Sequence, residues 1–506
     1  MKNRIAVTML GLLVMAGGVS AQAPAPSDPA RSDSINARPA LSTGVIDGQA
    51  QAGAPVASPD KAGQANRSAN NPAPPSPAVN AKPLLAPLAV VTSEQTPLSI
   101  DKAIAIGLQY NRGIKIAEEA YWRASGGVRV ARGARNPTLG IGGTYQRFDK
   151  VESAEIAPGQ SIKLGEIDSQ KARATLGIPI DVAGVLGASI STSEYQQKVA
   201  LLEYEAQRQT LALNVRRTYL AVLQAREQER VALDSVTSYR EQFRLANVRF
   251  EAGSAPKFDV LRAQTDLANA EQQLISAQNT SRLAAALLAN VLGVLLQSPL
   301  VMTNPIETDK TLGNIEDLVQ EGLKKRPEVV ANEAAIQAAQ KGIKVARRSQ
   351  LPSLNLELNY NYNGSTTLFQ PRQFTSDALV TVSLPIFDGG VAKGAVEQAK
   401  ATLGTAQAQQ DQTQLQVRLE IEQAVVSIEN AKKRLSTALT TLDQAREALR
   451  LSQVRYESGI GIPLEVTDAE VASTQAQTNV VNARYDVLLA YANLARATGE
   501  QSYAAN

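Results

Sequence analysis

One segment in the second half of the chain alternates apolar and polar residues without interruption. From Leu354 to Asn363 every second residue is Leu or Tyr, and the residues between them are Asn or Glu. Because successive side chains of a β-strand point to opposite faces, this pattern predicts a strand with one apolar face, which carries Leu354, Leu356, Leu358, Tyr360 and Tyr362. Shorter alternating segments predict three further strands, at Ala378–Leu384, Thr138–Phe148 and Arg173–Ile180.

The segments on either side of these strands have the composition and spacing of helices. Leu98–Arg135 and Ile315–Ser349 each lead into a pair of strands. After the strands of the first half, no glycine or proline occurs between Gly187 and Gly253, and at 1.5 Å per residue that run gives a helix of roughly 100 Å. The matching run of the second half extends from Thr405 to Ser458.

A glycine ends each long helix, and a further helix follows it. Gly253 and Gly459 occupy the position at which a helix C-terminus favours a left-handed backbone. Pro256 and Pro463 lie at the start of the next helix, where proline is well tolerated. Two shorter helices placed end to end have about the length of one long helix, so the lengths predict a tall helical wall.

The chain contains two copies of this unit. Ile100–Pro137 aligns without a gap with Ile315–Pro352, and Pro179–Gly293 aligns in the same way with Pro385–Gly499. The residue numbers differ by 215 in the first pair and by 206 in the second, so the first copy has a connection nine residues longer between its two blocks. Copies of this length indicate a duplicated half-molecule and not an array of short repeats.

The duplication defines the domain organisation of the folded part. We assign the first copy, the linker between the copies, the second copy and a C-terminal tail to residues 97–298, 299–313, 314–499 and 500–506.

The segment before the first copy has two parts. Residues 1–21 have the features of a secretory signal peptide, because Lys2 and Arg4 precede a short apolar stretch that is followed by small residues. Residues 22–96 are rich in Ala, Pro, Ser, Asn and Gly, and such a segment cannot bury enough apolar surface to fold. We therefore predict an exported protein with a disordered arm, for which a plain tether is the favoured role.

The composition removes most kinds of chemistry. The 506 residues include no histidine and no cysteine, which excludes catalytic triads with histidine, thiolate metal sites and disulfides. The formal net charge is only +3, which gives no electrostatic basis for binding nucleic acid. The acidic residues lie scattered along the helices without a catalytic context, so we predict no catalytic residue, no cofactor and no metal site.

The strands raise the question of a membrane. No run of the sequence after the signal peptide is long and apolar enough for a transmembrane helix. Strands that face lipid must close into a barrel, and four predicted strands are too few for one chain. Periodicity alone is equally compatible with a half-buried strand of a soluble sheet. If the strands do span lipid, several chains must share the barrel.

Three motifs, together with the duplication, resemble the TolC-type family of outer-membrane efflux proteins. They are the paired turns Arg249–Gly253 and Arg455–Gly459 and the segment Pro385–Gly390 after the last strand. The resemblance extends over about residues 97–500. It implies a mainly α-helical fold with a small β part, in which three chains form a 12-stranded outer-membrane β-barrel continued by a long periplasmic α-helical barrel.

The resemblance also implies partners and a function. The homotrimer would be the passive outer-membrane duct of a tripartite efflux or type I secretion system, in contact with outer-membrane lipid. A periplasmic membrane-fusion adaptor and an inner-membrane pump or ABC exporter would deliver the substrate. The long alternating strand would then present its apolar side chains to lipid.

Two groups of residues match functional positions of the family. The hairpin turns would be the periplasmic tips at which the adaptor docks, with Gly253, Ser254 and Ala255 in the first copy and Gly459, Ile460 and Gly461 in the second. Asp259, Tyr456, Glu465 and Asp468 match residues of the periplasmic gate. In that family a basic residue often occupies the position of Gly461, so the closed state of this chain would be less firmly locked. A plain αα-hairpin turn and first-turn helix acids are the alternative explanations.

Two other classes of protein remain to be weighed. A periplasmic coiled-coil adaptor or scaffold would share the signal peptide and the long hairpins, but it does not need two tandem pairs of strands. An enzyme is disfavoured by the absence of histidine and cysteine.

Overall fold

The computed structural model describes residues 90–91, 97–151, 153–163, 165–296, 301–304, 312–364 and 372–500. The predicted signal peptide and nearly all of the predicted arm lie outside the described residues, as do most of the linker and of the C-terminal tail.

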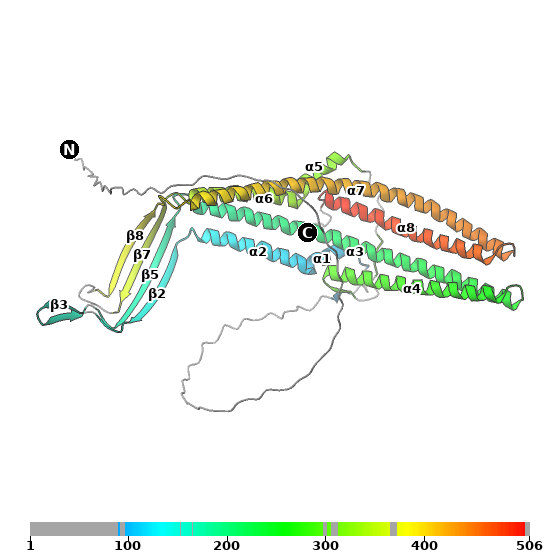
Figure 1. Ribbon diagram of the computed structural model, residues 1–506, viewed down its shortest axis with the longest axis horizontal. Helices are drawn as coiled ribbons and strands as arrows, with labels where there is room; N and C mark the ends of the chain where they lie inside the picture. The colour runs from blue at the N-terminus through cyan, green and yellow to red at the C-terminus, as the bar shows by residue number, and fades with distance from the viewer. Residues whose placement is uncertain are drawn as a thin grey trace, which may run out of the picture. The chain divides into compact units, whose positions relative to one another are not determined.

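Both halves of the chain have the same order of elements (Figure 1). The elements of the first half are α1 (Ile100–Tyr110), α2 (Arg112–Gly133), β2 (Thr138–Arg147), β5 (Asp168–Ile180), α3 (Val185–Glu251) and α4 (Lys257–Leu292). Their counterparts are α5 (Ile315–Lys325), α6 (Pro327–Arg348), β7 (Ser353–Asn363), β8 (Phe374–Ser383), α7 (Val391–Glu457) and α8 (Pro463–Ala497). The predicted tandem helix–strand–strand–helix unit is confirmed.

The helical segment before each pair of strands is broken once, which the sequence analysis did not predict. In the first half the Asn111 side chain accepts hydrogen bonds from the backbone of Gly113 (2.7 Å) and Ile114 (3.2 Å), and so caps a new helix. In the second half the break falls at Arg326, because the proline that follows disfavours helical geometry at the residue before it. The predicted single helices over Leu98–Arg135 and Ile315–Ser349 are therefore wrong.

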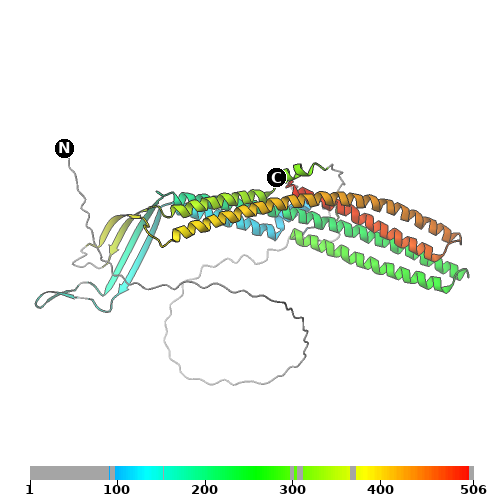
Figure 2. The ribbon, with the colours of Figure 1, turned by 45° about the horizontal axis from the view of Figure 1, so that its top comes forward.

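The two long helices, α3 and α7, each contain 67 residues, which corresponds to roughly 100 Å. Helices α2 and α4 both pack along α3, and α6 and α8 both pack along α7 (Figure 2). The predicted stacking of two short helices against one long helix is therefore confirmed. Helix α7 begins well before the predicted Thr405, since Gly394 and Gly404 lie inside it.

An aspartate side chain accepts backbone hydrogen bonds at the start of each long helix. The Asp181 carboxylate accepts hydrogen bonds from the backbone of Leu186 (3.0 Å) and Gly187 (2.8 Å) at the start of α3. Asp388 accepts in the same way from Gly390 (3.0 Å) and Ala392 (2.8 Å) at the start of α7. Because these bonds favour the charged carboxylate, they lower the pKa of Asp388 below its usual range, with the bond from Ala392 contributing most. Thus both copies have an aspartate that accepts backbone hydrogen bonds at the start of the long helix.

The four long strands form one antiparallel sheet in the order β2-β5-β7-β8. The central pair joins the two halves, because β5 belongs to the first copy and β7 to the second. Strand β8 begins four residues before the predicted Ala378 and strand β5 begins five residues before the predicted Arg173. Helices of the described chain pack on one another, and none of them lies across this sheet (Figures 1 and 2).

A short additional hairpin explains the longer connection of the first copy. Strands β3 (Ser153–Ala157) and β4 (Gln160–Lys163) pair with each other between β2 and β5. The difference in length is evident from the sequence, but this pairing of strands was not predicted.

The main core lies where the ends of the short helices meet the middle of α3. Val215, Tyr219, Leu288 and Leu292 are fully buried there. The Tyr219 hydroxyl lies 2.7 Å from the backbone oxygens of both Leu98 and Thr303 and can donate its one hydrogen to either. It also accepts from the Thr303 amide at 3.1 Å, so it is satisfied in its apolar surroundings. Short strands β1 (Val90–Val91) and β6 (Leu295–Leu296) pair in parallel. Among the helices of the described residues, none has the length and hydropathy that crossing a membrane requires.

Candidate functional site

The sheet has one apolar and one polar face. The registers place Leu356 of β7 beside Ile178 of β5 and Val380 of β8, and Leu358 beside Leu176 and Ala378. The apolar side chains predicted to share one side of β7 therefore continue across the neighbouring strands. The exposed positions of this face include Leu139, Ile141, Leu358, Tyr360, Val380 and Val382.

On the opposite face, polar side chains of three neighbouring strands are hydrogen-bonded to one another. Arg173 of β5 donates to Asn361 of β7 at 2.7 Å, and Asn361 donates to Asp377 of β8 at 3.1 Å. Asn359 accepts from Thr175 at 2.9 Å and donates to the other oxygen of Asp377 at 2.9 Å. Hydrogen-bonded polar groups thus cover one face, while the other face is apolar except at its end, where Tyr145 and Arg147 contact Asp168.

The hairpin turns lie at the ends of the long helices, as predicted. Gly253 (φ 70°) and Gly459 (φ 77°) adopt the left-handed backbone that favours glycine. Ser254 donates its backbone amide to the Arg249 oxygen (2.9 Å), and Ile460 donates to the Arg455 oxygen (3.0 Å), which closes each helix end. The turn residues are largely exposed, and Ile460 is 74% exposed.

Gly461 has a steric reason to be glycine. Its amide donates to the Arg455 oxygen at 2.8 Å. A Cβ atom at this position would lie 2.9 Å from the Tyr456 nitrogen and 3.1 Å from the Arg455 carbonyl carbon, which is too close for any side chain. The basic residue that the family often has here would therefore not fit this turn without a shift of the backbone.

An arginine that the sequence analysis did not single out links the two hairpins. The Arg249 guanidinium of α3 lies 4.0 Å from the centre of the Tyr456 ring, and it donates to the backbone oxygen of Tyr456 at 2.8 Å. A second, longer bond of 3.4 Å reaches the oxygen of Glu457. Both oxygens lie at the C-terminus of α7, where a cation is favourable.

The four predicted gate residues lie near these turns but are not joined to one another. Within the described chain no hydrogen bond connects Asp259 with Tyr456, and Asp259 is half-buried in the first turn of α4. Glu465 forms an ion pair with Arg455 (3.3 Å) across the second turn. Asp468 is exposed one turn further along α8. The link between the copies is made by Arg249 instead, which could have been suspected because both copies have an arginine four residues before the glycine.

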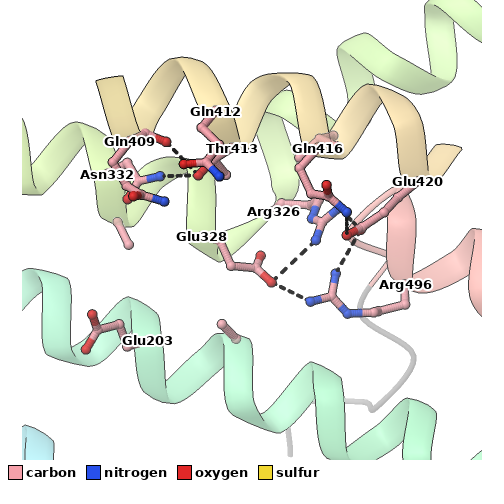
Figure 3. A pocket seen from close by; sticks show the side chains of 13 residues that line it. Glu203, Arg326, Glu328, Asn332, Gln409, Gln412, Thr413, Gln416, Glu420 and Arg496 are labelled. Carbon is pink, nitrogen blue, oxygen red and sulfur yellow. Dashed lines mark hydrogen bonds and ion pairs between the residues drawn. The ribbon is translucent and has the colours of Figure 1, made fainter. Parts of the chain in front are cut away.

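A cluster of four charged side chains marks the joint between α8 and α6 (Figure 3). Glu328 in the first turn of α6 pairs with Arg496 in the last turn of α8 at 2.5 Å and with Arg326 at 3.5 Å. Arg326, which is 4% exposed, also pairs with Glu420 of α7 at 2.5 Å. The cluster lies at the wall of a cavity of about 560 Å³. In Figure 3 the other polar side chains around this cavity come from α3, α6 and α7.

The charged cluster predicts a local loss of stability when one partner is removed. Arg326→Met is expected to lower the free energy of unfolding by about 3 kcal/mol, because Glu328 and Glu420 lose a buried partner. Arg418→Met is the matched control, since its pairs with Glu316 and Glu422 are exposed and such pairs contribute at most about 1 kcal/mol. Thermal unfolding of the purified protein measures both, and equal shifts would contradict a role for burial.

The same cluster predicts how stability depends on pH. Burial opposes ionisation of Glu328, but the charges of Arg496 and Arg326 outweigh it and lower the pKa of this carboxyl below its ordinary value of 4.5. A lowered pKa in the folded state stabilises the fold above the ordinary value and loses that effect as the pH falls below it. The difference in the free energy of unfolding between Arg326→Met and the native chain should therefore become smaller as the pH falls below this ordinary value.

Comparison with known proteins places this chain in a family. A family model described as outer membrane efflux protein matches residues 106–294 and 318–500. The chain is 27% identical to the pyoverdine export outer membrane protein OpmQ of Pseudomonas aeruginosa, over 62% of this chain and 64% of that protein. It is 25% identical to the alkaline protease secretion protein AprF of the same species, over 58% of this chain and 62% of that protein. These alignments thus span a little less than two thirds of either relative.

A solved structure gives the same result for the fold. The outer membrane protein VceC of Vibrio cholerae matches with a TM-score of 0.67 at 20% sequence identity, over 79% of this chain and 96% of that one. The resemblance inferred from the paired turns and the duplication is therefore confirmed, and the chain belongs to the outer membrane efflux protein family.

Proposed function

We propose that the chain is the outer-membrane channel of a tripartite efflux or type I secretion system, a passive duct without catalytic activity. The observation that supports this most strongly is the uncovered apolar face of the four-stranded sheet. Ile141 is 82% exposed, Val380 is 61% exposed and Val382 is 66% exposed. Apolar side chains on one face and a hydrogen-bonded polar network on the other are typical of a strand between lipid and an aqueous lumen. Leu354, Leu356, Leu358, Tyr360 and Tyr362 then face lipid.

The duct is a homotrimer in this proposal. Strands β2 and β8 each leave one edge without a partner in the described sheet, and an open edge is not compatible with lipid. Pairing of β2 with β8 of the next chain closes the barrel. Two exposed apolar stripes support the same assembly, on α4 at Phe258, Leu261, Leu283 and Leu287, and on α7 at Leu415, Leu419, Val426, Leu451 and Val454.

The remaining segments follow from this placement. Residues 1–21 direct export and residues 22–96 form a tether before the first copy, residues 97–298. Residues 299–313 join it to the second copy, residues 314–499, and the tail is residues 500–506. The periplasmic membrane-fusion adaptor reaches the tips Gly253, Ser254, Ala255, Gly459, Ile460 and Gly461, and an inner-membrane pump or ABC exporter supplies the substrate. The relatives are named for export of pyoverdine and for secretion of alkaline protease, which supports efflux and secretion alike.

Fractionation of cell membranes tests the proposal. The full chain should sediment with the outer membrane and migrate as a trimer that heat dissociates, and the purified trimer should conduct ions in a planar bilayer. A chain that stays in the periplasm and does not conduct would favour the alternative of a coiled-coil adaptor or scaffold.

The exposed turns predict that docking can be blocked without unfolding the chain. A Cβ atom at Gly459 would contact nothing within 4 Å, so only its left-handed backbone opposes substitution, at about 1–2 kcal/mol. Gly459→Trp and Gly459→Ala share that backbone cost, but only Trp adds bulk to the docking surface. We expect Gly459→Trp to reduce export at least tenfold with normal amounts of trimer, measured as dye accumulation in cells. Equal export by the two variants would leave only a backbone role for this glycine.

A further inference from the structure

The contact between the two hairpins differs in kind from the contacts within them. Within the hairpins the packing is apolar, with Val236 and Ala270 between α3 and α4, and Leu442 and Ala476 between α7 and α8. Between α3 and α8 the contact changes along its length: beyond Asn482, Tyr485 and Leu488 pack on the apolar core of α3, whereas from Asn482 toward the hairpin tips it is lined by polar side chains. Gln224 and Gln228 of α3 both donate to Asn482 of α8, at 2.8 and 2.7 Å. We call this contact the α3–α8 seam, which consists of Gln224, Gln228, Ser235, Ser238, Glu470, Ser473 and Asn482.

A carboxyl group is buried in the α3–α8 seam. Glu470 is 4% exposed, and its Oε2 atom has no hydrogen-bond partner among the described residues. The Ser238 hydroxyl of α3 lies close enough to the carboxyl group to favour its charged form. One helical turn further from the hairpin tips, Ser235 (5% exposed) and Ser473 (1% exposed) are also buried. Burying a charged carboxylate without a cation is costly, whereas a neutral carboxyl group fits such a site far better.

Among the described residues no cation contributes to the pKa of Glu470, which only burial and Ser238 shift. The charged groups that act on the neighbouring Tyr239 of α3 are Glu470 itself, Asp266 of α4 and Asp468 of α8, and all three are acids. Burial, and to a smaller extent the charges of these three acids, raise the pKa of Tyr239 to about 12. This phenol is therefore neutral. At the same level of α7, Arg450 is exposed and is paired with Glu447 at 2.7 Å.

We propose that Glu470 is a proton-operated latch in the α3–α8 seam, which holds the two hairpins together when protonated and lets the seam open when ionised. The proposal rests on the proposed function only in one respect, namely that opening of the seam widens the periplasmic end of a duct. The latch itself concerns the packing of α3 on α8 within one chain. Because the packing inside each hairpin is apolar, the polar seam near the tips, together with the link from Arg249 to Tyr456, is where the hairpins can separate, while the apolar contact at Tyr485 stays closed.

The sign of the effect follows from burial. Burial raises the pKa of Glu470 above its ordinary value of 4.5, and the Ser238 hydroxyl opposes this only in part. For an acid whose pKa is raised in the closed state, that state is favoured at low pH and loses the advantage as the pH rises through the raised value. The seam should therefore be closed in acid and open more readily as the pH approaches neutrality and above.

Conductance of the purified, full-length trimer in a planar bilayer tests the latch. Between about pH 5 and about pH 8 the resting conductance of the native chain should rise several-fold, and Glu470→Gln should keep it low throughout, since an amide fills the same space without ionising. Glu271→Gln is the matched control, because that carboxylate is exposed on α4 and paired with Arg240; it should retain the native profile. A native profile for Glu470→Gln, or no pH dependence in the native chain, would overturn the proposal. Failure of every variant to conduct would instead count against the duct.

A second measurement does not depend on conduction. The chain has no cysteine, so a single one can be introduced at Ser473, which is 1% exposed, or at Val471, which is 56% exposed. The rate of maleimide labelling at Ser473→Cys, divided by the rate at Val471→Cys, cancels the intrinsic pH dependence of the thiol. We expect this ratio to rise several-fold from about pH 5 to about pH 8 and to stay constant when Glu470→Gln is added. The same ratio in both backgrounds would refute the latch.

Discussion

Leu358→Arg should lower the amount of folded trimer in the outer membrane about 30-fold or more. Leu358 is the sixth of the 11 residues of β7, and it lies on the apolar face beside Leu176 and Ala378. Arginine on the lipid face near the middle of the bilayer costs about 2–4 kcal/mol in such barrels. Every 1.4 kcal/mol is a tenfold change in an equilibrium, so about 2 kcal/mol corresponds to a loss of about 30-fold. The trimer carries the substitution in each of its chains, which makes the loss larger.

The neighbouring residue provides the matched control. Asn359 lies on the polar face and donates to Asp377 at 2.9 Å, so an arginine there retains a carboxylate partner. We expect Asn359→Arg to reach the outer membrane in nearly native amount, as measured by unheated gel electrophoresis of membrane fractions. Equal losses for both variants would mean that the apolar face of β7 does not contact lipid.

The sequence predicted the fold because its strongest signals are local. Alternation over Leu354–Asn363 can only suit a strand, and the absence of glycine and proline from α3 allows one long helix. The predicted helix boundaries were wrong in two kinds of place: where a side chain caps a new helix, and where a long helix tolerates a glycine. Asn111 breaks one helix by capping the next, while Gly394 and Gly404 fail to break α7, since a glycine inside a long helix costs only about 1 kcal/mol.

The functional residues divide in the same way. Glycine punctuation identified both turns, because Gly253 and Gly459 are recognisable within a few residues of sequence. Arg249 and Glu470 were missed, since the contacts from which we infer their roles are with residues more than 200 positions away, on the other copy. Pattern within one helix does not carry that information: Arg249 could equally have paired along α3, as Arg244 does with Glu241.

Arg249→Ala is expected to raise the resting conductance of the trimer about tenfold. The guanidinium holds the C-terminus of α7 through the bond to the Tyr456 oxygen and through the ring of the same residue. A partly buried hydrogen bond from a charged donor contributes about 1.5 kcal/mol or more, which is about a tenfold change in the ratio of closed to open ends. Arg244→Ala should leave conductance unchanged, because the pair of Arg244 with Glu241 lies within α3 itself.

The four gate positions should respond differently from one another if this link governs the entrance. Tyr456→Phe keeps the ring and the backbone oxygen that Arg249 contacts, so its effect should be much smaller than that of Arg249→Ala. Asp259→Ala should also have a small effect, because Asp259 and Tyr456 are not bonded within the described chain. Large increases for Asp259→Ala and none for Arg249→Ala would show that the contact between chains, and not the link within one chain, holds the entrance shut.

The acidic pair tests selectivity separately from closure. Glu465 and Asp468 are both exposed and lie three residues apart on one face of α8. In a trimer they form two rings of like charge, which favour cations at the entrance. The double variant Glu465→Gln, Asp468→Asn should therefore lose cation selectivity, measured as the reversal potential in a salt gradient. Glu465→Gln also releases Arg455 from its 3.3 Å pair across the second turn, so Asp468→Asn alone separates the loss of ring charge from a disturbed turn. If Asp468→Asn leaves both selectivity and block by multivalent cations unchanged, these acids serve only the N-terminus of α8.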